Sequence, residues 1–320
     1  MIRIHQTLVV LTLLVGLAHS FDWDVVVGAL NKLEFYNNGA LVHSEDFGAN
    51  LSIEELVHDV VHNRLLIADI NKNQDTLIFS FNIATKELLP LVKRTLNNPF
   101  QQRIHSMAYD PVTEKLFWTD SDTISWFSLK PGFVNNIYGT TLIEFDLSTP
   151  FGIAVDSCKG YIYWAYDVDG ELNTIEKVPI DGSDREIVLE VNMSSIYNLV
   201  IDQQTRKMYW TDDVPTGRDK TFSINSADLN GENRRTLYID PERNQPRALS
   251  VSKDSIYWVP LNVDIHNIWK IPKNPTEDTK PTAVSASSWY TAAAKYNIED
   301  QIQGIQGCES LRNLLPKIGN

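Results

Sequence analysis

The sequence predicts an all-β protein, a six-bladed β-propeller of four-stranded antiparallel blades that is closed by strands from both termini. Three observations lead to this prediction: a Trp-centred tetrapeptide recurs, an apolar strand end precedes it, and tight-turn sequences follow it. The tetrapeptides are Phe117-Trp118-Thr119-Asp120, Tyr163-Trp164-Ala165-Tyr166, Tyr209-Trp210-Thr211-Asp212 and Tyr257-Trp258-Val259-Pro260, spaced by 46, 46 and 48 residues. Such a period is typical of small sheets that must stack, because none can bury its apolar face alone.

Each period predicts four strands. In three copies an apolar strand end finishes in Asp about eight residues before the Trp, and these residues are Asp110, Asp156 and Asp202. The fourth copy has Ser252 instead and a hairpin two residues shorter. Later in the period, Asp181-Gly182 and Asn230-Gly231 are strong signals for two-residue hairpins. The expected order is therefore strand, hairpin, strand, loop, strand, hairpin, strand.

Weaker copies extend the array toward the N-terminus. Leu65–Asp69 resembles the motif, with Ile67 at the Trp position and Asp59 eight residues earlier. Val25–Ala29 predicts the second strand of a still earlier unit, which makes six units but leaves the first without its innermost strand. The segment Trp289–Ile298 is expected to supply that strand. Such closure removes the sheet edges that a linear array leaves open.

Residues 1–20 predict a secretory signal peptide. They combine a basic start, the apolar run Leu8–Leu17 and the small-x-small sequence Ala18-His19-Ser20. A membrane anchor is the alternative, but the apolar run is too short to span a bilayer comfortably. We therefore expect the propeller over residues 21–300 and a C-terminal tail over residues 301–320.

We expect a secreted, extracellular glycoprotein without a membrane span. Asn50-Leu51-Ser52 and Asn192-Met193-Ser194 are glycosylation acceptor sequences. Cys158 and Cys308 are expected on the same face of the propeller, where a disulfide is one possibility and two free thiols are the alternative. The formal net charge of −13 argues against nucleic acid and anionic membranes as partners.

The recurring motif resembles the low-density-lipoprotein-receptor class B repeat, also called the YWTD repeat. Tyr209-Trp210-Thr211-Asp212 matches the motif in full, and the resemblance covers roughly residues 24–300. The stretch Gly152–Trp164, with the placement of Cys158, strengthens the similarity to an insect member of this family. The resemblance implies a six-bladed propeller that binds protein ligands. The endings Ala165-Tyr166 and Val259-Pro260 depart from the motif.

The aromatic motif residues are interpreted as structural. They are Trp118, Trp164, Tyr209, Trp210 and Trp258. Large aromatic side chains repeated once per blade fill the space between neighbouring sheets.

We expect no enzymatic activity, no cofactor and no metal site. The sequence His58-Asp59-Val60-Val61-His62 imitates the H-E-x-x-H zinc motif, but that motif requires a helix and a Glu base. Here the segment aligns with a junction between a strand and a hairpin. The nucleophile motif G-x-S-x-G, a phosphate-binding loop and a dinucleotide fingerprint are absent from the sequence. A calcium hydrolase is disfavoured, since the predicted inner strands are mostly apolar.

The loops after each Trp motif are expected to share one face of the propeller. Candidate ligand contacts on this face are Asp120, Asp122, Tyr166, Asp167, Asp169, Asp212, Asp213 and Asp264. Clustered carboxylates attract basic partners, and aromatic side chains inside a charged rim are typical of protein-binding surfaces. The alternative is that Asp is frequent there because it suits turns.

Two functions are compatible with the sequence. The first is a secreted, non-catalytic binding protein that recognises a protein or peptide, of basic character, through the acidic face. The alternative is a secreted carrier of a small molecule, such as a pigment, in the central funnel. An apolar central pocket of about 300 Å³ or more favours the carrier. A narrow channel beneath an acidic, aromatic face favours the binding protein.

Overall fold

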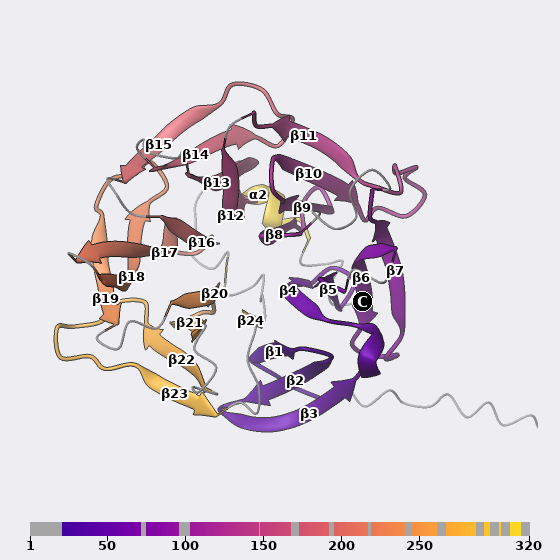
Figure 1. The fold of residues 1–320 in the computed structure, drawn as a ribbon, viewed down its shortest axis with the longest axis horizontal. Helices are drawn as coiled ribbons and strands as arrows, with labels where there is room; N and C mark the ends of the chain where they lie inside the picture. Colours follow the sequence, from indigo (N-terminus) through magenta and orange to yellow (C-terminus); the bar gives the residue numbers. More distant parts are fainter. Residues whose placement is uncertain are drawn as a thin grey trace, which may run out of the picture.

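The computed structural model contains six four-stranded antiparallel sheets arranged in a ring (Figure 1), so the predicted six-bladed propeller is confirmed. The structure describes residues 21–71, 75–95, 103–146, 148–167, 173–191, 195–216, 219–240, 245–260, 267–285, 291–294, 301 and 308–314. The predicted signal peptide, residues 1–20, lies outside the described residues.

The first three blades follow one another along the chain, and each runs from an innermost strand to an outer edge strand. Blade 1 contains β24 (Thr291–Ala294), β1 (Val25–Ala29), β2 (Lys32–Asn37) and β3 (Ala40–Asp46). Blade 2 contains β4 (Ile53–Asp59), β5 (Arg64–Asp69), β6 (Thr76–Asn82) and β7 (Leu88–Lys93). Blade 3 contains β8 (Ser106–Asp110), β9 (Lys115–Thr119), β10 (Thr123–Ser128) and β11 (Thr140–Glu144).

The other three blades repeat the same order. Blade 4 contains β12 (Thr149–Asp156), β13 (Tyr161–Asp167), β14 (Asn173–Pro179) and β15 (Glu186–Val191). Blade 5 contains β16 (Ile196–Asp202), β17 (Lys207–Thr216), β18 (Asp219–Asp228) and β19 (Arg235–Asp240). Blade 6 contains β20 (Pro246–Val251), β21 (Ser255–Pro260), β22 (Asn267–Pro272) and β23 (Thr282–Ser285).

The core lies between neighbouring blades, and the motif aromatics fill it. Successive residues of a strand point to opposite faces of the sheet. Trp210 therefore packs toward blade 4, in one apolar cluster with Tyr163, while Tyr209 packs toward blade 6, in one cluster with Trp258. In the same way Phe117 meets Trp164 between blades 3 and 4. All four motif Trp side chains are buried.

Buried carboxylates at the ends of innermost strands connect one blade to the next. Asp156 Oδ1 accepts hydrogen bonds from the backbone N–H groups of Cys158 (3.1 Å) and Lys159 (3.2 Å), which fixes the hairpin after β12. Its two oxygens also accept a bidentate pair of hydrogen bonds from Arg206 of blade 5, at 2.5 and 2.6 Å. The Asp that ends the strand thus fixes both its own hairpin and the neighbouring blade.

Strands from both ends of the chain close the ring, as predicted. In blade 1 the C-terminal strand β24 pairs with the N-terminal strand β1, placing Val26 opposite Ala293. Of the two alternatives for Cys158 and Cys308, the structure contains the disulfide, with the two Cα atoms 4.6 Å apart. Cys308 immediately precedes helix α2 (Glu309–Arg312).

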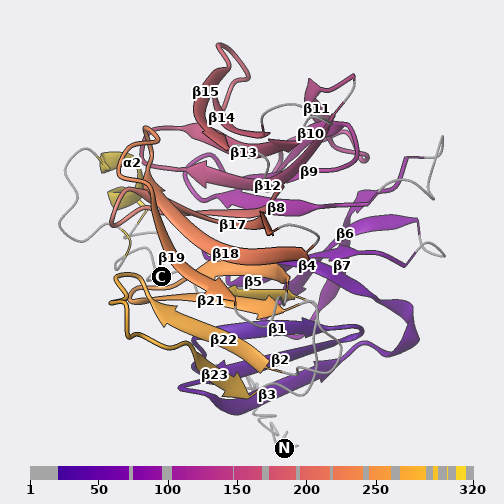
Figure 2. The ribbon, with the colours of Figure 1, turned by 60° about the vertical axis from the view of Figure 1, so that its left-hand side comes forward.

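Helix α2 lies against the hairpins that follow the innermost strands of blades 2, 3 and 4 (Figures 1 and 2). Leu311 and Leu314 pack there against Val60, Val112 and Cys158. We call this side of the ring the lower face. The upper face is the opposite side, where the innermost strands begin. No helix within the described residues has the length and apolar character needed to cross a membrane.

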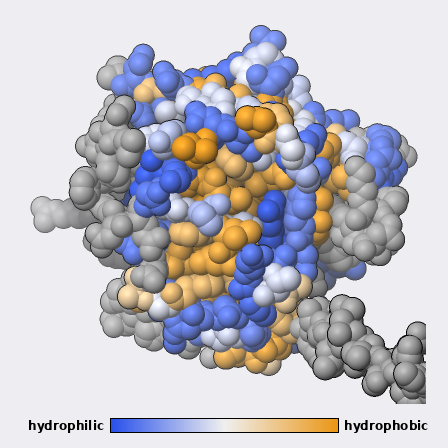
Figure 3. Space-filling view, turned by 90° about the vertical axis from the view of Figure 1, so that its right-hand side faces the viewer, coloured by the Kyte–Doolittle hydropathy of each residue, from blue (hydrophilic) through white to orange (hydrophobic). Residues whose placement is uncertain are grey.

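The rim of the propeller carries exposed apolar side chains near β7. Figure 3 shows an extensive apolar area on this side of the molecule, and Leu89 of β7 is 48% exposed. Pro90 follows it in the same edge strand. Proline lacks the backbone N–H that a further strand needs for pairing, so this free edge is protected against strand addition.

Candidate functional site

Three of the acidic residues expected to face a ligand are instead buried, and this corrects the sequence-based expectation. Asp120, Asp212 and Asp213 are 7%, 1% and 3% exposed. Asp120 Oδ1 accepts hydrogen bonds from the backbone N–H and the hydroxyl of Thr123, and burial raises the pKa of its carboxyl group. Asp212 Oδ1 accepts a hydrogen bond of 2.9 Å from Asn225 Nδ2. The Asp120 carboxylate thus stabilises a turn and the Asp212 carboxylate joins strands β17 and β18, and neither faces solvent.

The other expected contacts are divided between exposed, half-buried and undescribed side chains. Asp122 is exposed on the upper face. Tyr166 is half-buried, with its ring centroid 5.0 Å from that of Phe145 and 4.8 Å from the guanidinium carbon of Arg185. Asp169 and Asp264 lie outside the described residues, as does the side chain of Asp167. The same is true of the glycosylation candidates, Asn192 entirely and the Asn50 side chain at the end of helix η1 (Gly48–Asn50).

The upper face instead has a depression at the centre of the ring, which we call the channel mouth. It has a volume of about 250 Å³. Its lining comes from five blades and consists of Glu54, Glu55, Arg103, His105, Phe151, Tyr197, Asn198, Gln245 and Pro246.

One repeat position supplies most of this lining. Glu54, His105, Phe151, Tyr197 and Gln245 each stand thirteen residues before the residue at the motif's Trp position. The residue type at this position changes from blade to blade. Packing between the blades therefore does not require one particular residue type there. This regular spacing is the sequence signal that finds the mouth, and the sequence-based reasoning above missed it.

β-Bulges accompany three of these side chains at the mouth. The pairing of β4 with β5 shifts register around Glu54, the pairing of β12 with β13 shifts around Phe151, and that of β16 with β17 shifts around Tyr197. A bulge leaves one residue without a partner on the neighbouring strand and redirects its side chain. In a regular strand these side chains would point between the blades. At the mouth, the bulge turns them toward the axis of the ring.

The side chains at the mouth include a continuous aromatic row. The rings of His105 and Phe151 are stacked, with centroids 5.2 Å apart and planes at 19°. Phe151 meets Tyr197 edge to face at 6.2 Å. The Tyr197 hydroxyl donates a hydrogen bond of 3.3 Å to Asp213 Oδ2. Asp213 therefore serves the site indirectly, because it orients an aromatic side chain of the mouth.

The protonation state of His105 follows from its surroundings. Burial lowers the pKa of the imidazole and, with a smaller contribution from the charge of Arg103, outweighs the backbone contact with Pro150 and the charges of Asp120 and Glu54, which raise it. Nδ1 lies 3.2 Å from the carbonyl oxygen of Pro150. Because a carbonyl oxygen only accepts, Nδ1 carries the proton and Nε2 is an acceptor. His105 is therefore a neutral ring at neutral pH.

An ion pair borders the aromatic row. Arg103 Nε donates a hydrogen bond of 3.0 Å to Glu54 Oε1, which joins blade 3 to blade 2 across the mouth. The Arg103 side chain is 49% exposed, whereas that of Glu54 is only 11% exposed. The mouth thus combines half-buried aromatic surface with a charged edge that is open to solvent. This composition suits recognition of a partner that brings both apolar and polar groups.

The hairpin formed by β17 and β18 of blade 5 is longer than the corresponding hairpin of blade 3. Strands β17 and β18 remain paired as far as Thr216 and Asp219, beyond the level at which β9 and β10 pair in blade 3. Phe222 of β18 is buried, with its ring centroid 6.5 Å from that of Tyr197. The aromatic row therefore continues from the mouth into the base of this hairpin.

Comparison with known proteins supports a low-density-lipoprotein-receptor class B-like six-bladed propeller. No family model matches the chain. A chain in the crystal structure of a nidogen/laminin complex has the same fold, with a TM-score of 0.63, 17% sequence identity, and coverage of 85% of this chain and 98% of that chain.

The sequence is similar to that of the protein cueball of fruit flies, in agreement with the resemblance noted at Gly152–Trp164. It is 27% identical to cueball of Drosophila yakuba over 275 residues, which cover 81% of this chain. It is also 27% identical to cueball of Drosophila sechellia over 291 residues, or 86% of this chain. The chain spans about two fifths of the length of these relatives, 40% and 42% respectively.

Proposed function

We propose that this chain is a secreted, non-catalytic binding domain that recognises an extracellular protein or peptide at the channel mouth. The aromatic row of His105, Phe151 and Tyr197 is the observation that supports this proposal most strongly. Half-buried aromatic side chains beside a charged edge have the composition of protein-binding hot spots. The similar fold of a chain from a nidogen/laminin complex adds support for a protein partner.

The partner is proposed to be basic. The formal net charge of −13 attracts cationic partners at long range. At the mouth, two carboxylates, Glu54 and Glu55, stand against the single cationic side chain of Arg103 among the described lining residues. Binding that depends on these charges weakens as salt concentration rises, because salt screens exposed charges.

A pigment carrier is a weaker alternative. The cavity inside the channel has a volume of about 160 Å³. This is below the roughly 300 Å³ at which pockets for drug-sized molecules begin. This cavity alone is therefore too small for a pigment-sized molecule.

Affinity capture from extracellular fluid tests the proposed function. The double variant Phe151→Ala/Tyr197→Ala removes two rings of the row. The matched control, Ile187→Ala/Ile239→Ala, removes two apolar side chains on the outer strands that are 60% and 55% exposed. Both variants are first compared with the wild type by near-UV circular dichroism, to verify folding.

The mouth variant is expected to lose a bound partner that the wild type and the control retain. Loss of a hot-spot residue costs about 2 kcal/mol or more, which is roughly a thirty-fold loss of affinity. Equal recovery of every partner by both folded variants contradicts the proposal. If recovery of the partner does not depend on salt concentration, the partner is not bound through its basic groups. That result refutes the proposed basic character and leaves the proposed binding at the mouth intact.

A further inference from the structure

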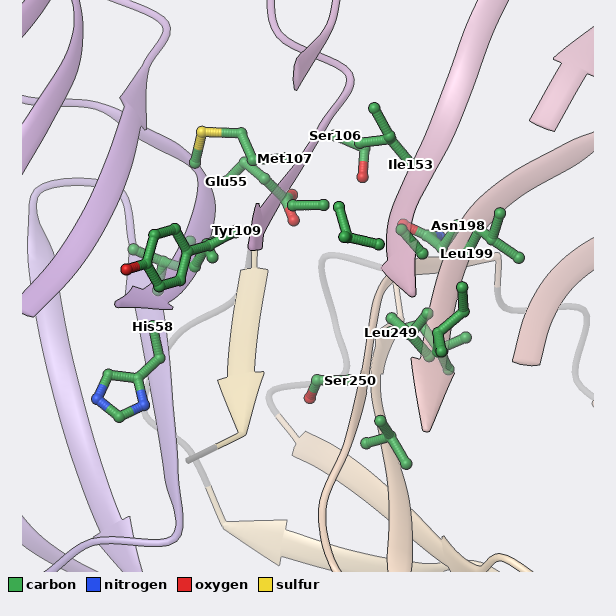
Figure 4. Close-up of a pocket in the computed structure, with 18 of the residues that line it drawn as sticks. Glu55, His58, Ser106, Met107, Tyr109, Ile153, Asn198, Leu199, Leu249 and Ser250 are labelled. Atoms are coloured by element: carbon green, nitrogen blue, oxygen red, sulfur yellow. The ribbon is translucent and has the colours of Figure 1, made fainter. Parts of the chain in front are cut away.

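A separate cavity lies inside the channel, below the mouth (Figure 4). It has a volume of about 160 Å³ and is surrounded by the innermost strands β4, β8, β12, β16 and β20. Its walls combine apolar side chains from five blades, Leu56, Met107, Ile153, Leu199 and Leu249, with polar side chains such as those of Glu55, His58 and Asn198. Figure 4 shows Glu55, Ser106 and Asn198 toward one end of the cavity and Leu249 and Ser250 toward the other.

The cavity connects with the mouth, since Glu55 and Asn198 line both. Asn198 is held in place at this junction because its Nδ2 donates hydrogen bonds to Thr211 Oγ1 (3.1 Å) and to the carbonyl oxygen of Pro246 (3.2 Å). The cavity is therefore adjacent to the mouth on the upper face.

The C-terminal segment supports the lower end of the cavity. Gln203 lines the cavity there, and its backbone N–H donates a hydrogen bond of 2.9 Å to Gln301 Oε1. Ser157 also lines it, and its carbonyl oxygen accepts a hydrogen bond of 3.2 Å from the hydroxyl of Ser310. The Cys158–Cys308 disulfide joins the same two segments covalently. The lower end is thus fixed in position by contacts that the propeller strands alone do not provide.

Among the polar groups of the lining, the Ser250 hydroxyl is available to a ligand. The Ser250 hydroxyl is buried and has no hydrogen-bond partner within the described part of the chain. A buried hydroxyl without a partner costs free energy, which a ligand that completes the hydrogen bond recovers. Serine changes its χ1 rotamer readily, so the hydroxyl can turn toward a bound molecule.

We propose that the channel cavity binds a small neutral molecule with one aromatic ring and one hydroxyl group, that is, a simple phenol. Apolar cavities of about 150 Å³ in other proteins hold a single benzene ring, so the volume fits one ring. The apolar walls favour the ring, and Ser250 provides a partner for the hydroxyl group. This site is distinct from the protein contacts proposed at the mouth and does not depend on them.

The test uses p-cresol as the probe and the methionine methyl groups as reporters. Met107 lines the cavity, whereas Met208 is buried between blades 4 and 5 and does not line it. In protein labelled with ¹³C at the methionine methyl groups, p-cresol is expected to shift the Met107 signal saturably and to leave the Met208 signal in place. Calorimetry measures the dissociation constant of the same complex.

Two substitutions at Ser250 and one control establish the location. Ser250→Leu fills part of the cavity and is expected to weaken p-cresol binding at least ten-fold. Ser250→Ala removes only the hydroxyl group and is expected to weaken it about three-fold. Ser44→Leu, on the exposed outer strand β3, makes the same chemical change as Ser250→Leu and is expected to leave binding unchanged.

The proposal is overturned by three results. One is the absence of saturable binding to the wild type at millimolar p-cresol. Another is a shift of Met208 equal to that of Met107. The third is unchanged affinity in folded Ser250→Leu. If that variant does not fold, the Met107 titration of the wild type and of Ser250→Ala decides the question alone.

Discussion

The disulfide between Cys158 and Cys308 offers a quantitative test of how the ring is closed. The perturbation is the double variant Cys158→Ala/Cys308→Ala, which removes the cross-link and leaves the β-strands of all six blades unchanged. Cys308 is fully buried and packs with Leu311 and Leu314, so the C-terminal segment retains part of its docking surface without the bond.

The expected loss of stability follows from the length of chain that the bond closes. The two cysteines are separated by 150 residues in sequence. Removing such a cross-link restores conformational entropy to the unfolded chain, and the loop-closure relation gives about 5 kcal/mol at 25 °C. Measured disulfides usually stabilise by less than this relation gives, so we expect a loss between about 2 and about 5 kcal/mol.

Equilibrium unfolding in urea, followed by Trp fluorescence, measures the loss. The single variant Cys158→Ala is the matched control, because it also lacks the bond but retains the thiol of Cys308. Both variants are expected to unfold at the same lower urea concentration. A loss below about 1 kcal/mol in both would refute the view that this bond holds the lower end of the propeller closed.

Three further predictions follow from individual contacts. Gly152→Ala is expected to destabilise the protein by about 1–3 kcal/mol, because a Cβ atom there would lie 2.5 Å from the backbone nitrogen of Leu199. An unchanged midpoint of thermal unfolding argues against this close approach. The imidazole of His105 is expected to titrate below the ordinary pKa of about 6.5 in an NMR titration. Its contribution to stability is then present above about pH 6.5 and is lost as the pH falls toward the folded-state pKa. A measured pKa at or above the ordinary value contradicts the burial of the ring. Lys273→Met is expected to lower the free energy of unfolding in urea by about 3–5 kcal/mol. In the wild type, Lys273 Nζ lies 2.6 Å from the buried carboxylate of Asp202, which loses its counter-charge in the variant. A decrease below about 1 kcal/mol refutes this role of Lys273.

The fold could be predicted from the sequence because each blade repeats the same physical solution. The motif Trp marks the second strand, and the Asp eight residues earlier marks the end of the innermost strand. Even the degenerate copy at Ile67 retains Asp59 at that spacing. The closing strand was predictable for a different reason: once the first blade lacked an inner strand, the segment containing Ala292–Ala294 remained to provide it.

The site was less predictable than the fold, because the type of a residue does not show whether its side chain is buried. Asp120 and Asp212 end the Trp motif, after which exposed loops were expected, yet their carboxylates turn inward to accept hydrogen bonds. The aromatic row was missed because His105, Phe151 and Tyr197 are chemically different and far apart in sequence. Only their shared repeat position, together with the bulges that redirect two of them, brings them together.

Site-specific photo-crosslinking tests the proposed role of the channel mouth most directly. A benzophenone side chain is placed at position 151, in the aromatic row, or at position 187, on the exposed outer strand β15. After incubation with extracellular fluid, illumination is expected to attach a protein partner at position 151 and to give no such product at position 187. Attachment of the same partner at position 187 but not at position 151 would contradict binding at the mouth.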